Sequence, residues 1–201
     1  FDDTRSIAET SGALALAGLK AYIERENAMD QTLVAVTSGA NMNFDRLRHV
    51  AERSELGEKR EAIFARSISG RRGIFFKFIQ ILGSRNITEF NYRYGDENEA
   101  HIFVGIQTNG LADKATIIQA LQSAELPVID LTENEIAKIH IRYMVGGRTD
   151  KVANERVFSF EFPERPGALG NFLMAMQSGW NITLFHYRNH GADYGRILIG
   201  I

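Results

Sequence analysis

Cysteine is absent from the 201 residues, which excludes disulfides and thiolate metal sites. Long apolar runs are absent too: none approaches the roughly 20 residues that a helix needs to cross a bilayer. The opening residues, FDDTRSIAE, lack the basic and then apolar order of a signal peptide. Charge of one sign is not in excess, because the formal net charge is -2, whereas nucleic-acid-binding chains are usually clearly basic. We therefore expect a soluble, cytoplasmic protein without a nucleic-acid or membrane partner.

Several site types are also missing. The five histidines show no metal-ligand spacing, and the first sixty residues contain no glycine-rich phosphate loop. A hydrophobic content of 44% is sufficient for a sizeable core and for more than one folding unit. The chain opens at Phe1 and closes on the alternating apolar run GRILIGI, so we expect it to be part of a longer protein.

A repeat organises the chain from residue 63 onwards. Residues 63–85, shifted forward by 94 positions, match residues 157–179, and after one inserted residue the match continues at a shift of 95. The coinciding residues include Phe64 with Phe158, Gly73 with Gly167, Phe78 with Phe172, Asn86-Ile87-Thr88 with Asn181-Ile182-Thr183, Phe90 with Phe185, and Tyr92-Arg93 with Tyr187-Arg188. This density of identities indicates a duplicated unit.

The first copy contains six predicted elements. Periodicity predicts strands at 61–68, 87–94, 101–108 and 126–131, and helices at 71–83 and 114–123. This βαββαβ order is typical of a ferredoxin-like unit, with both helices on one face of an antiparallel sheet. The second copy contains only the first four elements, so we expect it to be incomplete.

A rigid corner, FEFPERPGAL at 160–169, precedes the helix of the second copy. We predict Pro166 near the first helical position, where its missing N–H has no cost. Gly167 would let another backbone or a ligand approach the helix N-terminus. A stiff corner without further function is the alternative interpretation.

Residues 1–57 follow a different pattern. Periodicity predicts a helix at 10–26, a short buried strand at 32–37, and a second helix at 44–56 with Asn43 as its N-cap. Ser38, in the phrase SGAN, would then lie at the carboxyl end of a strand, where open α/β sheets bind ligands. An ordinary turn is the competing interpretation.

Together these phrases resemble the biosynthetic threonine dehydratases, which are pyridoxal-phosphate enzymes. The resemblance is carried by FDDTRSIAE, SGALALAG, SGAN before NFDRLRHVAERSELGE, EFNYRY, KIHIRYMVGGR, FEFPERPGALGNFL and WNITLFHYRNHGADYGR. One departure is Thr10-Ser11, where relatives often have proline and a small residue. The family deaminates L-threonine to 2-oxobutanoate and ammonia in isoleucine biosynthesis, with isoleucine as inhibitor and valine as activator.

The resemblance implies an α/β segment at 1–57, the end of a fold-type II catalytic domain. It is followed by α+β ACT-like regulatory units, one at 58–149 and an incomplete one at 150–201. The resemblance also implies that Ser38 binds the pyridine nitrogen of pyridoxal 5′-phosphate. The chemistry agrees, since a neutral hydroxyl leaves that nitrogen unprotonated. Neither Lys20 nor Lys59 lies in the family's Schiff-base motif, so no catalytic residue is assigned and this piece alone should be inactive. A homotetramer is also implied.

A branched amino-acid effector needs an aliphatic pocket and polar partners for its charged groups. Leu169 and Leu173 lie on one face of the second copy's helix, and both copies carry a Tyr-Arg pair. Alternation places the two tyrosines on one sheet face and the two arginines on the other, so that one type would line a pocket and the other would act across an interface. The candidate effector residues, which the resemblance also indicates, are Leu169, Leu173, Tyr187, Arg188, Tyr92 and Arg93. Core leucines and solvated edge arginines are the alternative.

Two other functions compete with an allosteric lyase. A stand-alone pair of ACT-like units could sense an amino acid and regulate a partner, and a purely structural unit could pair subunits. The phrase SGAN favours the lyase, because a stand-alone sensor has no use for a cofactor-binding turn.

Overall fold

A computed structural model describes most of the chain, and it divides at Arg53 into two compact units. We call residues 1–53 the N-terminal unit and residues 54–201 the sheet unit. None of the described helices combines the length and the apolarity that are needed to cross a membrane. The described residues are 4–39, 42–57, 60–68, 74–95, 99–147, 149–176, 180–189, 191 and 193–201.

Two capped helices form at the positions that the sequence predicts. Helix α1 (Thr10–Glu26) begins where the Glu9 side chain accepts the Ser11 N–H at 3.1 Å, and it ends at Asn27 in the left-handed region. Helix α2 (Phe44–Gly57) begins where Asn43 accepts the Arg46 N–H at 2.9 Å. Such side-chain acceptors satisfy amides that lack partners in the first turn.

The buried strand predicted at 32–37 is wrong. This segment forms no strand, and Val34 and Val36 are 82% and 75% exposed. A strand needs a neighbouring strand for its backbone groups, and within the described ranges no strand pairs with this segment. Ser38 therefore does not follow a strand, and the rest of the SGAN phrase, Ala40 and Asn41, lies outside the described residues.

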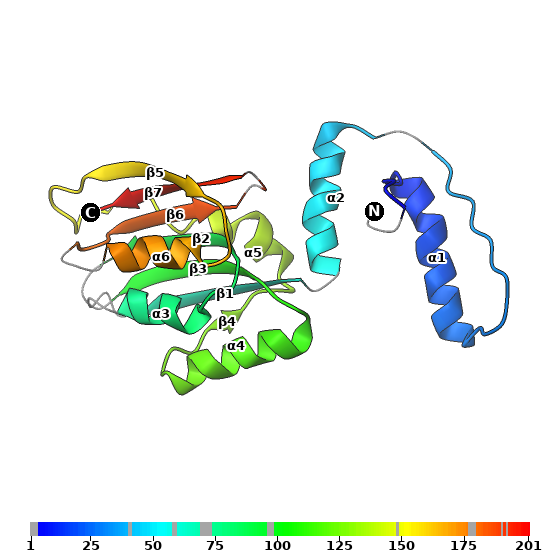
Figure 1. Cartoon of the computed structure of the whole chain (residues 1–201), viewed down its shortest axis with the longest axis horizontal. Helices are drawn as coiled ribbons and strands as arrows, with labels where there is room; N and C mark the ends of the chain where they lie inside the picture. The colour runs from blue at the N-terminus through cyan, green and yellow to red at the C-terminus, as the bar shows by residue number, and fades with distance from the viewer. Residues whose placement is uncertain are drawn as a thin grey trace. The chain divides into compact units, whose positions relative to one another are not determined.

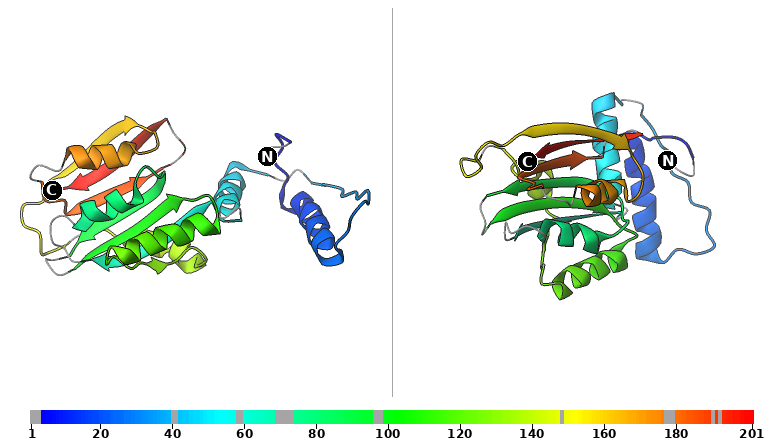
Figure 2. Two further views of the ribbon diagram at one scale, coloured as in Figure 1. Left: turned by 60° about the horizontal axis from the view of Figure 1, so that its bottom comes forward. Right: turned by 60° about the vertical axis from the view of Figure 1, so that its left-hand side comes forward.

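The sheet unit is built on one antiparallel sheet of seven strands in the order β4-β1-β3-β2-β6-β7-β5. Helices α3, α4 and α6 cover one face, and α5 lies on the other (Figures 1 and 2). The elements are β1 (Glu61–Ile68), α3 (Ile74–Leu82), β2 (Ile87–Tyr94), β3 (Ala100–Gln107), α4 (Leu111–Ser123), β4 (Ile129–Asp130), α5 (Glu135–Ile139), a 3-10 turn η1 (Ile141–Tyr143), β5 (Val157–Pro163), α6 (Ala168–Ala175), β6 (Leu184–Arg188) and β7 (Tyr194–Gly200).

The first six of these elements confirm the predicted βαββαβ order. Strands β1 and β2 have the predicted bounds, whereas β3 begins one residue early and α4 three residues early. The final strand is much shorter than predicted, because only Ile129 and Asp130 pair with β1. Gly83 adopts φ 65 immediately after α3, as expected of a glycine that ends a helix. Residues 71–73 of the predicted helix lie outside the described residues.

The sheet continues across the repeat because β2 pairs with β6. Asn91 lies opposite His186, Tyr92 opposite Phe185, and Phe90 opposite Tyr187. The segment from β5 to β7 repeats the strand-helix-strand-strand order of β1 to β3, so the two copies extend one sheet side by side.

The main core lies between the sheet and α3, α4 and α6. Phe75 of α3 packs against Phe90 with ring centroids 5.4 Å apart, and Phe90 packs against Phe185 at 5.9 Å. Aromatic residues of both copies thus share one apolar cluster. Burial of such large rings is the main favourable contribution to folding.

Each copy has a glutamate, a threonine and a glycine in the same arrangement. Thr88 donates its hydroxyl hydrogen to Glu61, and a Cβ added to Gly105 would lie 2.4 Å from the Thr88 Oγ1 atom. In the second copy Thr183 donates to Glu155 beside Gly200. Only glycine leaves room for this contact.

The corner at Pro166 differs from the prediction. Helix α6 begins at Ala168, and Gly167 precedes it with φ 81 and ψ -5. The Ala168 N–H donates to the Arg165 carbonyl at 2.9 Å, which closes a type II turn with proline and glycine at its two central positions. Pro166 therefore shapes this turn and is not the first helical residue.

Candidate functional site

A narrow cleft lies where the end of α3 meets the start of α6. The cleft is tight, with room for about one water molecule between its walls. On one side it is lined by Gly83, Arg85, Asn86 and Ile87, between α3 and β2. On the other side it is lined by Glu164, Arg165, Gly167, Leu169 and Gly170, with Tyr187 of β6.

The type II turn sets the width of this cleft. A Cβ added to Gly167 would lie 4.0 Å from Ser84 in the opposite wall, which is an ordinary van der Waals distance, so the two corners are in contact without a clash. The positive φ of Gly167 adds a conformational reason for glycine, since side chains are rarely found in that region. The positive φ, and not the close backbone approach that the sequence suggested, is therefore the reason for glycine at this position.

Tyr187 and Glu164 form the polar floor of the cleft. Tyr187 is 1% exposed, and its hydroxyl donates to the Glu164 Oε2 atom at 2.8 Å. Burial, and then the adjacent Glu164 carboxylate, raise the pKa of Tyr187 far above its usual range. The hydroxyl therefore stays protonated and holds the carboxylate in place.

Charged groups of both signs surround this floor. Glu164, Arg85 and Arg165 are the charged residues among those that line the cleft. The start of α6 adds backbone N–H groups, which favour anions. Leu169 and Ile87 provide aliphatic surface. Acidic, basic and aliphatic residues therefore meet in one cleft.

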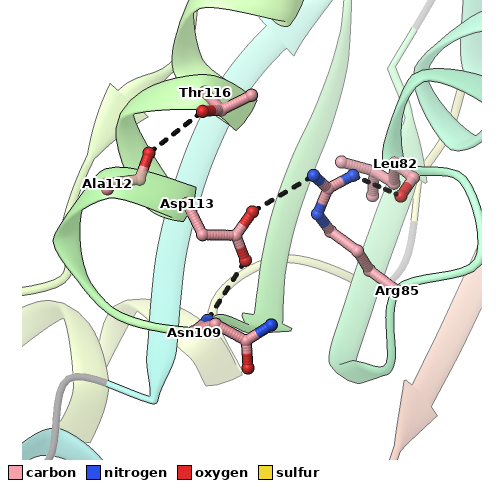
Figure 3. Close-up of polar contacts among 6 residues, drawn as sticks. All are labelled: Leu82, Arg85, Asn109, Ala112, Asp113 and Thr116. Atoms are coloured by element: carbon pink, nitrogen blue, oxygen red, sulfur yellow. Dashed lines mark hydrogen bonds and ion pairs between the residues drawn. The ribbon is translucent and has the colours of Figure 1, made fainter.

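Arg85 also connects the cleft to α4, as Figure 3 shows. Its guanidinium donates to the Leu82 carbonyl and to the Asp113 Oδ1 atom, both at 3.2 Å. The Asp113 Oδ2 atom accepts the Asn109 N–H at 3.1 Å, just before α4 begins. The pKa of Asp113 is lowered, first by the hydrogen bond from Asn109 and also by Arg85. One wall of the cleft is thereby fixed to the loop between β3 and α4.

Only two of the six candidate effector residues line the cleft. They are Leu169 and Tyr187. Leu173 lies one turn further along α6 and is fully buried in the core. Tyr92 faces the same side of the sheet as Tyr187, but its ring packs against Phe75 with centroids 4.8 Å apart.

The two arginines lie on the opposite sheet face, as alternation predicts. Arg93 is 6% exposed and bridges the copies, with its Nη1 and Nη2 atoms 2.6 Å and 3.1 Å from the two carboxylate oxygens of Glu155. Arg188 is half-buried and donates to the Tyr143 hydroxyl at 3.3 Å. Arg93 therefore joins the two copies within one chain.

Ser38 belongs to the N-terminal unit. It is exposed, and its carbonyl oxygen would lie 2.9 Å from a Cβ added to Gly12 of α1. Close packing against α1 therefore holds the backbone of Ser38. Its hydroxyl makes no hydrogen bond to any of the described residues.

Seven lining residues were not predicted from the sequence as part of a site: Gly83, Arg85, Asn86, Ile87, Glu164, Arg165 and Gly170. Glu164 lies within the PERPG phrase, so its position beside a helix start was the available signal. Arg85 and Ile87 belong to the other copy, and they reach the cleft through the β2–β6 pairing. Sequence periodicity does not specify which strands of two copies will pair.

Comparison with known proteins gives a consistent result. The family model described as the C-terminal regulatory domain of threonine dehydratase matches residues 52–141 and 146–201. A biosynthetic L-threonine dehydratase of Burkholderia multivorans is 59% identical over 100% of this chain and 40% of its own length. The Escherichia coli protein of the same name is 53% identical over 98% of this chain and 39% of its own length. The mitochondrial threonine dehydratase of Saccharomyces cerevisiae is 45% identical over 100% of this chain and 37% of its own length.

The chain thus spans about two fifths of the length of the curated bacterial relatives that it matches. The matched family residues cover all seven strands of the sheet and both walls of the cleft. The chain belongs to the threonine dehydratase family, and its residues 52–141 and 146–201 match the C-terminal regulatory domain of that family.

Proposed function

We propose that the cleft binds isoleucine and that its occupancy regulates the dehydratase of which this chain is the regulatory part. The observation that carries the proposal is the gathering of a carboxylate, two guanidinium groups, a helix start and an aliphatic wall in one cleft. Family membership supports an amino-acid effector.

Each group of the effector has a partner of suitable chemistry. The ammonium group would bind Glu164, which Tyr187 already holds in place. The carboxylate would bind Arg165 or Arg85 and the amides at the start of α6. The branched side chain would contact Leu169 and Ile87, where apolar surface would be removed from water.

The narrowness of the cleft suggests how binding would be transmitted. The two corners lie close together, so an amino acid would enter only as the walls move apart. Arg85, Asp113 and Asn109 would then carry that movement to the loop before α4. A ligand that prefers the open form shifts the population towards it by its difference in affinity for the two forms.

The other candidate residues would act behind the cleft. Leu173 would support Leu169 from the core, and Tyr92 would support β6 through the shared aromatic cluster. Arg93 would transmit movement between the copies through Glu155. Arg188 would do so through Tyr143. Valine, which differs from isoleucine by one methylene group, would bind the same cleft as the activator.

The complete protein would be a pyridoxal 5′-phosphate-dependent threonine ammonia-lyase that forms 2-oxobutanoate and ammonia. Residues 1–57 would be the end of its catalytic domain, and residues 58–149 and 150–201 would be two ACT-like units, the second of them incomplete. When bound, the cofactor would supply the electron sink for elimination. Ser38, with a hydroxyl that is open to a ligand atom, fits a partner of the pyridine nitrogen. A homotetramer is the proposed assembly.

Replacing Glu164 by glutamine is expected to weaken isoleucine binding about 10- to 100-fold, because a hydrogen bond to a charged group is replaced by a neutral one. Isothermal titration of the full-length protein with isoleucine measures the effect. Loss of this carboxylate leaves the apolar wall intact, so saturable binding should persist at higher concentration.

Glu161 provides the matched control. It lies on β5, three residues before Glu164, and pairs with Arg196 at the exposed surface. The substitution Glu161→Gln removes the same charge outside the cleft, and the isoleucine affinity should change less than about twofold. Equal weakening in both variants would contradict the placement of the ammonium group at Glu164.

A further inference from the structure

Asn109 and Gly110 form the only Asn-Gly pair in the 201 residues. They connect β3 to α4, and with Arg60, Gln107 and Thr108 they line an open polar hollow at the end of β3. In such a pair the backbone nitrogen of glycine can attack the side-chain amide of asparagine, because glycine has no Cβ to hinder the approach. Asparagine is accordingly among the residues that heat damages chemically.

Neither reacting group of this pair is held by a hydrogen bond. Among the described residues, the Asn109 side-chain amide has no hydrogen-bond partner and the Gly110 N–H donates to no acceptor. Asn109 is exposed, and a Cβ added to Gly110 would meet no atom within 4 Å. The asparagine side chain is therefore free to rotate, and the glycine nitrogen is open to it.

Two other exposed asparagines provide a comparison within the same chain. Asn27 precedes Ala28 at the end of α1, and Asn154 precedes Glu155. In both pairs the attacking nitrogen would carry a residue with a Cβ. Exposure is thus shared by the three asparagines, and the following glycine distinguishes Asn109.

We propose that Asn109 is a deamidation site, at which conversion to aspartate and isoaspartate loosens the start of α4. A bond forms between the Gly110 nitrogen and the Asn109 Cγ atom, and the bond from Cγ to the side-chain nitrogen breaks. The hydrogen of the Gly110 N–H leaves with that amide group as ammonia. Water, the only co-reactant, then opens the succinimide ring at either carbonyl and gives aspartate or isoaspartate.

Both products disturb the hydrogen bond that joins this loop to α4. The Asn109 N–H donates to the Oδ2 atom of Asp113, the third residue of α4, at 3.1 Å (Figure 3). This contact resembles the half of a capping box in which a side chain of the first turn accepts an N–H that precedes the helix. Isoaspartate inserts its side-chain methylene into the backbone between the two partners. Aspartate places a second negative charge near Asp113.

The change reaches the cleft through Arg85. The Asp113 carboxylate that accepts the Asn109 N–H also accepts from the Arg85 guanidinium, at 3.2 Å. A displaced carboxylate no longer fixes this arginine, which lines one wall of the cleft. The modification itself is independent of what the cleft binds.

The test is incubation of the full-length protein in mildly alkaline buffer, followed by peptide mass spectrometry. Isoaspartate is detected by methylation with protein L-isoaspartyl methyltransferase and radiolabelled S-adenosylmethionine. The peptide containing Asn109 is expected to acquire the mass of an acid in place of an amide and to carry the label, whereas those containing Asn27 and Asn154 stay unchanged. Hydrogen exchange at the start of α4 should become faster as the label accumulates.

Asn109→Gln is the matched control, since it keeps the amide and the backbone N–H but requires closure of a larger ring. This variant should acquire no label over the same period, and its hydrogen exchange at α4 should stay constant. An unmodified Asn109 in the incubated wild-type protein, or equal modification of Asn27 and Asn154, would overturn the assignment of the site. Unchanged exchange in labelled protein would overturn the loosening of α4. These measurements use no isoleucine, so their failure leaves the proposed function standing.

Discussion

An alanine in place of Phe90 is expected to lower the free energy of unfolding of the sheet unit by about 3–5 kcal/mol. Phe90 is fully buried, and its ring packs against Phe75, Phe78 and Phe185. Removing it leaves a cavity at the strand pair that joins the two copies, where the backbone cannot readily collapse. Urea unfolding followed by circular dichroism measures the loss.

Leu111→Ala is the control for this prediction. Leu111 is exposed at the first position of α4, and alanine is a good helix former. The free energy of unfolding should therefore change by no more than about 0.5 kcal/mol. A loss below about 1 kcal/mol for Phe90→Ala would contradict the shared aromatic core.

The substitution Arg93→Ala is expected to destabilise the protein by about 3 kcal/mol, because it leaves the Glu155 carboxylate without its partner in a largely buried site. The Glu155 side chain is 20% exposed, which places the effect at the lower end of the range for buried pairs. Thermal and urea unfolding both measure it.

A double variant separates the lost ion pair from the lost bulk of the arginine. Arg93→Met combined with Glu155→Leu removes both charges, and it should recover most of the stability that Arg93→Ala loses. Arg188→Ala is the symmetry-related control, since Arg188 is half-buried and its contact is with an exposed tyrosine. A double variant as unstable as the single one would show that packing, and not charge, dominates at Arg93.

The stability contributed by Glu155 is expected to depend on pH. Hydrogen bonds from Arg93 and then Thr183 hold the pKa of Glu155 below its ordinary value of 4.5. A lowered pKa in the folded state means that the stabilisation is fully present above pH 4.5 and is lost as the pH falls through the folded-state value. The difference in urea midpoint between wild type and Glu155→Gln should therefore shrink steadily on acidification below pH 4.5. A constant difference would contradict this linkage.

Most of the sheet unit could be predicted from the sequence, because strand alternation and helical periodicity are both local patterns. Alternation located β1 and β2 to the residue, and helical periodicity located α1. Alternation also placed Tyr92 and Tyr187 on one sheet face and Arg93 on the other. These features depend only on residues that are near in the chain, or on comparison of one copy with the other.

The errors arose where partners distant in the sequence decide the outcome. The apolar pattern at 32–37 indicates a strand, but a strand also needs a neighbour. Leu169 and Leu173 share one helix face, and periodicity alone does not distinguish a cleft wall from core packing. Arg85 enters the cleft only because β2 pairs with β6, and no local pattern encodes that pairing.

The exchange of corresponding positions across β2 and β6 is the geometry of a symmetric dimer contained within a single polypeptide. In a true homodimer, one codon specifies both halves, so every substitution appears in both. Here corresponding positions such as Phe75 and Leu169 are encoded separately. A substitution can therefore change one half alone, a freedom that identical subunits do not have.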